Sequence, residues 1–88
     1  MKKPEELIEV FTEIDDPEVM ENFFNEIFTP AERQDFTTRW QSMKLLSQNI
    51  PQRKIAEMLG ISLCKITRGA KVLKQKNSVS KKILTTND

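Results

Sequence analysis

Basic, hydroxyl and thiol side chains share one face of a predicted helix that follows Ser62 and ends near residue 75 or 76, where they could bind the groove of a DNA duplex. Cys64, Thr67, Lys71 and Lys74 recur every three or four residues, which is the spacing of a single helical face. Lysine and threonine side chains donate hydrogen bonds to phosphate oxygens and to base edges. The pattern therefore indicates recognition of nucleic acid rather than bond-breaking chemistry.

A short helix and a tight turn precede this face and would position it. Pro51 suits the first position of a helix, where its missing N–H costs nothing. Gly60 can adopt the left-handed backbone conformation that ends a helix, and Ser62 is a favoured N-cap for the next helix. Residues 51–76 therefore form a predicted helix-turn-helix, with a purely structural helix pair as the alternative. The apolar residues at helical spacing are Ile55, Met58 and Leu59 in the first helix and Ile66, Ala70 and Leu73 in the second.

Further side chains of this segment are predicted DNA contacts. Gln52, Arg53 and Lys54 stand at the N-terminus of the first helix, where they can meet phosphates. Lys65 could donate either to a guanine edge or to a phosphate oxygen. Leu63 could contact a thymine methyl group or complete the core. Lys71 and Lys74 are expected to meet the DNA backbone.

The charges of the chain are segregated along its length. Residues 1–50 carry five basic and eleven acidic side chains, whereas residues 51–88 carry nine basic and two acidic ones. The helix-turn-helix thus lies in the basic part, as a phosphate-binding surface requires. Lysines that only solubilise a surface helix would not explain this segregation.

Several functional classes are disfavoured by composition. The chain has no histidine, no tyrosine and a single cysteine, so we expect no enzyme, no metal site, no cofactor and no internal disulfide. Cys64 is most simply a small residue on the outer face, and redox sensing is the alternative. No apolar run approaches eighteen residues and no signal-peptide pattern occurs, so a soluble, cytoplasmic protein without membrane contact is expected.

The residues before the helix-turn-helix also predict helices. Asp16 caps a helix that begins at Pro17, and Thr29 to Glu32 form a capping box for a helix that runs to about residue 48. We expect an all-α fold of five to six helices in a single domain, with residues 3–48 contributing to a homodimer. Residues 77–88 form either one short helix or a frayed tail. The apolar residues expected on the inner faces are Leu7, Val10, Phe11 and Ile14, then Val19, Met20, Phe23, Phe24 and Ile27, then Phe36, Trp40, Met43 and Leu46.

Over about residues 28–74 the chain resembles the bacterial tryptophan repressor family. The motifs that carry the resemblance are Phe-Thr-Pro-Ala-Glu-Arg at 28–33, Thr38-Arg39, Gln52-Arg53, Leu59-Gly60, Ile66-Thr67-Arg68-Gly69 and Leu73-Lys74. This resemblance implies an intertwined, all-helical homodimer that binds L-tryptophan as corepressor and then a palindromic operator. The helix-turn-helix part alone is shared with many regulators, so a regulator independent of tryptophan is one alternative. A small helical adaptor that binds an acidic protein is another.

The resemblance also implies a ligand site. Arg39 and Arg68 would sandwich the indole ring, and Arg68 would also meet the ligand carboxylate. Thr29 would hydrogen-bond nearby, while Gly69 would leave room for the ring. Salt bridges or phosphate contacts are the alternative for the arginines, and a helix irregularity is the alternative for Gly69.

The chain departs from the family pattern at three places in this site. Val72 stands where the family has a serine near the ligand amino group. Glu26 and Phe28 occupy the segment where the partner subunit's loop usually reads Leu-x-Leu, so Glu26 is a candidate for a compensating charge. The loop before Pro51 is one residue shorter. Thr38 is a candidate phosphate contact, with helix packing as its alternative.

Overall fold

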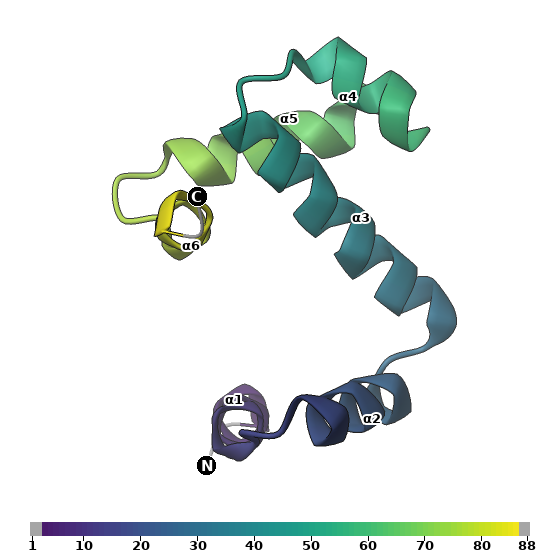
Figure 1. Cartoon of the computed structure of the whole chain (residues 1–88), viewed down its shortest axis with the longest axis vertical. Helices are drawn as coiled ribbons and strands as arrows, with labels where there is room; N and C mark the ends of the chain where they lie inside the picture. Colours follow the sequence, from purple (N-terminus) through teal and green to yellow (C-terminus); the bar gives the residue numbers. More distant parts are fainter. Residues whose placement is uncertain (1–2, 87–88) are drawn as a thin grey trace. The chain divides into compact units, whose positions relative to one another are not determined.

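A computed structural model describes residues 3–86, which contain six α-helices and no β-strand (Figure 1). This confirms the predicted all-α fold. The chain divides into two compact units, one ending at Arg33 and the other beginning at Gln34. The helices are α1 (Lys3–Glu13), α2 (Pro17–Ile27), α3 (Pro30–Ser47), α4 (Gln52–Leu59), α5 (Leu63–Lys74) and α6 (Val79–Thr86).

Aromatic rings hold the first unit together. The ring centroids of Phe11 on α1 and Phe23 on α2 lie 5.3 Å apart in an edge-on arrangement, and Phe28 stacks on Phe11 at 6.3 Å. Phe24 contacts Phe28 at 4.9 Å. The Arg33 guanidinium donates hydrogen bonds to the carbonyl oxygens of Asn25 and Phe28, so it ties the start of α3 to the end of α2. These rings contact one another but are only half-buried, and no residue of α2 is buried. Val19 and Ile27 were expected on the inner face of α2, but they are 50% and 44% exposed.

The N-terminal ends of α2 and α3 are capped as predicted. The Asp16 carboxylate accepts hydrogen bonds from the backbone N–H groups of Glu18 at 2.8 Å and Val19 at 3.4 Å. At α3 the Thr29 hydroxyl accepts from the Glu32 N–H, and the Glu32 carboxylate accepts from the Thr29 N–H. These reciprocal bonds satisfy backbone donors that have no partner within a helix.

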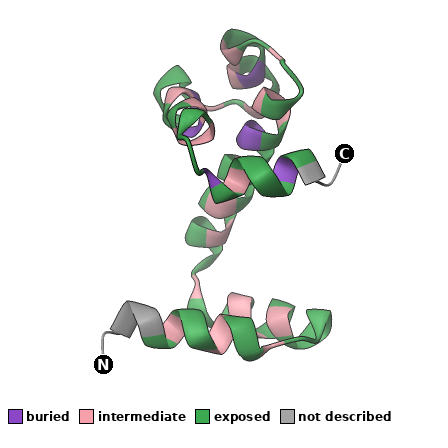
Figure 2. Cartoon of the chain, turned by 90° about the vertical axis from the view of Figure 1, so that its left-hand side faces the viewer, coloured by how far each residue is buried: buried purple, intermediate pink, exposed green. Residues whose placement is uncertain are grey.

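The second unit contains the helix-turn-helix. Gly60 ends α4 with a positive φ of 65°, which is the left-handed conformation expected there. Ile55 of α4 and Ile66 of α5 are completely buried, and Met43 and Leu84 are nearly so (Figure 2). This small core joins α3, α4, α5 and α6.

Gly69 is buried where α5 packs against α3. A Cβ atom at this position would lie 3.1 Å from the Met43 side chain and 3.8 Å from the Ser42 hydroxyl. Ser42 and Met43 are themselves buried. Close helix packing therefore accounts for a glycine in the middle of α5, despite its cost of about 1 kcal/mol relative to alanine.

Several local predictions about α3, α4 and α5 need correction. Pro51 is the N-cap of α4 and not its first helical residue. Ser62 is the N-cap of α5, as predicted, but its side chain makes no hydrogen bond to the helix. Met58 is 52% exposed and Trp40 is 40% exposed, although both were expected to face inward. Each lies three positions from a buried residue, about 60° around the helix, at the margin of the apolar face.

Helix ends also differ slightly from the predictions. α1 ends at Glu13, so Ile14 follows the helix, and α3 ends at Ser47. The segment after residue 77 forms the short helix α6, begun by hydrogen bonds from the Lys81 N–H to the Ser78 hydroxyl and from the Lys82 N–H to the Ser78 carbonyl. None of the helices described between residues 3 and 86 is long and apolar enough to cross a membrane.

The two kinds of N-cap predict different effects of mutation. Asp16→Ala should lower the free energy of unfolding by about 1 kcal/mol, because two backbone N–H groups lose their acceptor. Ser62→Ala should change it by less than about 0.5 kcal/mol, since Ser62 makes no such bond. Urea unfolding followed by circular dichroism measures both, and equal losses would contradict the assignment of the caps.

The packing of Gly69 gives a second prediction. Gly69→Val should destabilise the protein by about 1–3 kcal/mol, because the side chain would overpack against Met43 and Ser42. Lys71→Val on the exposed side of α5 is the matched control and should change stability by less than about 0.5 kcal/mol. If urea denaturation shows Gly69→Val to be as stable as the unmodified chain, α5 does not approach α3 this closely.

Candidate functional site

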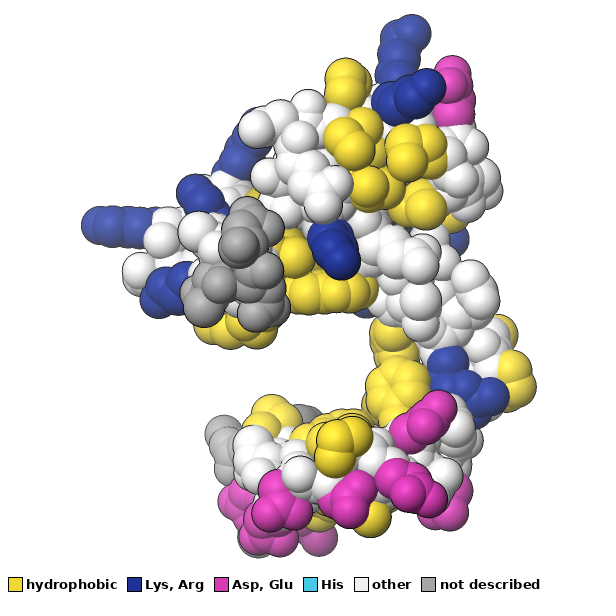
Figure 3. Space-filling view, viewed as in Figure 1, with side chains coloured by type: hydrophobic (Ala, Val, Ile, Leu, Met, Phe, Trp, Pro, Cys, Tyr) yellow, Lys and Arg dark blue, Asp and Glu magenta, His cyan; other side chains and the backbone are white. Residues whose placement is uncertain are grey.

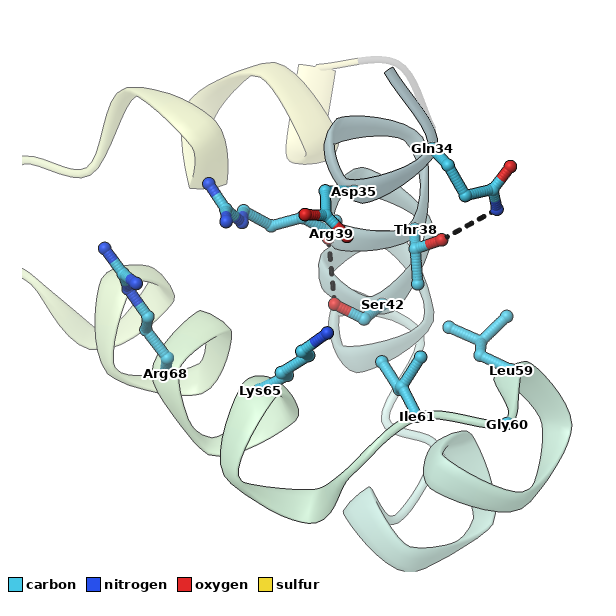
Figure 4. A pocket seen from close by; sticks show the side chains of 10 residues that line it. All are labelled: Gln34, Asp35, Thr38, Arg39, Ser42, Leu59, Gly60, Ile61, Lys65 and Arg68. Carbon is cyan, nitrogen blue, oxygen red and sulfur yellow. Dashed lines mark hydrogen bonds between the residues drawn. The ribbon is translucent and has the colours of Figure 1, made fainter. Parts of the chain in front are cut away.

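A pocket of about 370 Å³ lies in the second unit between α3 and the helix-turn-helix (Figure 4). One wall is a face of α3, a second is the turn that joins α4 to α5, and the third is the beginning and middle of α5. The pocket lies beside the point where α5 approaches α3 at Gly69, and Ser42 belongs both to that contact and to the pocket lining. The lining residues are Gln34, Asp35, Thr38, Arg39 and Ser42 of α3, Leu59, Gly60 and Ile61 at the turn, and Lys65 and Arg68 of α5.

The two predicted ligand-binding arginines line this same pocket. Arg39 extends from α3 and Arg68 from α5, and Figure 4 shows both side chains reaching toward the same side of the hollow. Both side chains are exposed, so a ligand could reach their planar faces and their N–H donors. Ligand binding by this pair stays a prediction.

Gly69 does not line the pocket, although it was predicted to leave room for a ligand ring. Its missing side chain instead lets α5 approach Met43 and Ser42. Gly69 therefore acts on the pocket indirectly, because it sets the distance between the two helices that carry Arg39 and Arg68.

Three of the predicted ligand residues belong to the first unit. Thr29 forms the capping box of α3, Phe28 contributes its ring to the aromatic cluster, and Glu26 is exposed near the end of α2. A contact of these residues with the ligand stays a prediction.

The predicted DNA-reading face is largely open to solvent. Cys64, Lys65, Lys71 and Lys74 of α5 are exposed, and Cys64 is a free thiol. Leu63 is 43% exposed, so it does not complete the core. In Figure 3 basic side chains are spread over the second unit, while acidic ones crowd the first. The accessible basic face on α5 suits contact with phosphates.

Three other predicted DNA residues have structural roles as well. The Thr67 hydroxyl donates to the side-chain oxygen of Gln52 at 3.0 Å, which ties α5 to the start of α4. It also lies 3.0 Å from the Leu63 carbonyl oxygen, one helical turn earlier. Thr38 accepts a hydrogen bond from Gln34 and lines the pocket. Arg53 and Lys54 are exposed at the start of α4.

Sequence reasoning missed three polar residues of the pocket, Gln34, Asp35 and Ser42. Asp35 precedes Arg39 by four residues and Ser42 follows Arg39 by three, so Asp35, Arg39 and Ser42 lie on one face of α3. That spacing was a usable signal once Arg39 was a candidate. Lys65 was predicted only as a DNA contact, and it also lines the pocket.

Comparisons with known proteins agree with this architecture. The family model described as "Trp repressor protein" matches residues 2–88. A Trp operon repressor homolog from Vibrio campbellii is 32% identical over 83 residues, which cover 93% of this chain and 83% of the relative. Homologs from Xylella fastidiosa and Chlamydia caviae are 36% and 34% identical, over 83% and 78% of this chain and 80% and 69% of their own lengths. No solved structure matches the chain significantly.

The family match spans almost the whole chain, beyond the segment in which the motifs first indicated it. It includes α1, α2 and α6 as well as the helix-turn-helix. This family consists of DNA-binding transcriptional regulators and is not a family of enzymes. The chain therefore belongs to the Trp repressor family.

Proposed function

We propose that this protein is a tryptophan-dependent transcriptional repressor that binds L-tryptophan in the pocket between α3 and α5. The observation that carries the proposal is that α5 serves two purposes. It forms one wall of the pocket through Arg68, and its exposed face carries the predicted DNA contacts. A ligand held between Arg39 and Arg68 would therefore touch the element that reads DNA.

The chemistry of the two arginines suits an aromatic amino acid. A guanidinium plane stacks on an indole ring, and its N–H donors form a fork that matches a carboxylate. Arg68 would bind the ligand carboxylate, and Arg39 would cover the opposite face of the ring. A ligand that fits only one angle of α5 relative to α3 favours that angle by its difference in affinity for the two arrangements.

We further propose that the active form is a homodimer. Apolar side chains remain exposed in both units, among them Ile8, Val19, Val79 and Ile83, and a second copy would cover them. In such a dimer Glu26, Phe28 and Thr29 would approach a ligand from the neighbouring loop. Two helix-turn-helix units related by a two-fold axis would read a palindromic operator.

The proposed DNA contacts divide by chemistry. Lys71, Lys74, Arg53 and Lys54 meet phosphates, which sets affinity and orientation. The start of α5 meets base edges through Leu63, Cys64, Lys65 and Thr67. Gln52 and Thr38 support the contacts with the DNA phosphates.

Tryptophan dependence is tested with a duplex selected from a random library by the protein in the presence of L-tryptophan. We expect L-tryptophan to raise affinity for that duplex about 5- to 150-fold and two chains to bind each duplex. Arg68→Ala should weaken L-tryptophan binding by about tenfold or more, because the carboxylate loses its charged donor. Arg68→Lys should recover only part of this loss, since it keeps the charge and not the fork.

The alternatives give other outcomes in the same assay. Tight binding to one palindrome without any effect of L-tryptophan would indicate a tryptophan-independent regulator. Weak binding that does not discriminate among sequences would indicate a helical adaptor for an acidic partner. A complex with one chain per duplex would contradict the homodimer.

The lysines of α5 predict a change in the salt dependence of DNA binding. Lys71→Gln combined with Lys74→Gln should reduce the slope of log affinity against log salt by about 1 for each phosphate that the variant no longer neutralises. Affinity should fall by a similar factor for the selected duplex and for a random duplex, because phosphates carry no sequence information. Lys44→Gln, at an exposed lysine in the last turn of α3, is the control and should leave the slope unchanged. An unchanged slope in the double variant would mean that this face does not meet the DNA backbone.

A further inference from the structure

Among the described residues, Asp35 is the only acidic one that lines the pocket. It stands one helical turn before Arg39 on α3, and the other charged lining residues are the cations Arg39, Lys65 and Arg68 (Figure 4). The pocket therefore offers three positive groups for an anion and a single negative group for a cation. A ligand that pairs with both kinds of group must carry a negative and a positive charge.

The two hydroxyl groups of the pocket on α3 make hydrogen bonds within that helix. The Thr38 hydroxyl accepts a hydrogen bond from the Gln34 amide at 3.2 Å, and the Ser42 hydroxyl donates to the Arg39 carbonyl at 2.8 Å. Among residues 3–86, the hydrogen bonds and ion pairs of the structure leave the Asp35 carboxylate without a side-chain partner. Asp35 is thus the strongest acceptor of the pocket that a ligand ammonium group could use.

We infer that Asp35 binds the α-ammonium group of the corepressor and so makes the pocket select amino acids over deaminated analogues. This inference rests on the proposed tryptophan site and adds a specificity-determining residue to it. Side chains four residues apart on a helix have Cβ atoms about 5–6 Å apart. From the same helix, Asp35 can therefore bind the ammonium group of a ligand while Arg39 covers its ring. Arg68 binds the carboxylate of that ligand from α5.

Two other roles are open to a carboxylate at this position. Asp35 could hold the Arg39 side chain in place from one turn away, or it could attract Lys65 across the pocket. In either case Asp35 would act on the ring or the carboxylate of the ligand through another residue. Loss of Asp35 would then weaken every indole carboxylate equally, whether or not it carries an amino group.

The test compares two probes on the full chain by calorimetry. L-Tryptophan carries the ammonium group, and indole-3-propionate has the same ring and carboxylate without it. We expect Asp35→Asn to weaken L-tryptophan binding about three- to tenfold and to leave indole-3-propionate binding unchanged or stronger. Asp35→Glu keeps the charge and should restore much of the preference. Glu57→Gln on exposed α4, outside the pocket, changes net charge equally and should affect neither probe.

Each outcome separates this inference from the proposed function. If the unmodified chain binds L-tryptophan and Asp35→Asn weakens both probes equally, Asp35 is a positioning residue and the inference is wrong. If Asp35→Asn weakens neither probe, the ammonium group has another partner and the inference is also wrong. If the unmodified chain binds neither probe, the tryptophan site itself is wrong and the inference falls with it. Thermal melting of each variant, which should match the unmodified chain, shows that these differences do not arise from misfolding.

Discussion

The close approach of α5 to α3 at Gly69 is the contact on which the pocket of the second unit depends. Gly69 lies against Met43 and Ser42, and a Cβ atom there would come within 3.1 Å of the methionine side chain. Arg68 precedes this glycine directly on α5, and Arg39 precedes Ser42 by less than one turn on α3. The distance between the two arginines therefore follows from how near two backbones can come at a single glycine. A small change there alters the width of the pocket.

The two helices of the helix-turn-helix, α4 and α5, would move together when the width of the pocket changes. Ile55 of α4 and Ile66 of α5 are completely buried between the helices, and Thr67 is hydrogen-bonded to Gln52 across the same contact. Densely packed interfaces of this kind shift between discrete arrangements and do not deform gradually. A ligand that acts on α5 would therefore also carry α4 and its N-terminal arginine and lysine with it.

The features that could be predicted from sequence are those that depend on near neighbours in the chain. The caps at Asp16 and Thr29 and the left-handed Gly60 each involve residues within four positions. The periodicity of apolar residues indicates the direction of a helix face and not what covers it, so Met58 and Trp40 were placed inside when they lie at its margin. The pocket is formed by α3 and by a distant segment from the end of α4 to α5, and for this reason the packing role of Gly69 against Met43 and Ser42 was not visible in sequence. Asp35 could have been found only from its spacing to Arg39 on α3.

The charges of the pocket bear on DNA binding as well as on the ligand. Arg39, Lys65 and Arg68 belong to the same basic unit as the lysines of α5, and they contribute to the positive potential that attracts phosphates. An anionic ligand would cancel one of these charges at the moment when the protein must bind a polyanion. A zwitterion adds no net charge, provided that a carboxylate such as Asp35 receives its ammonium group. A pocket that pairs three cations with one carboxylate would thus accommodate an amino acid without weakening the attraction of α5 for DNA.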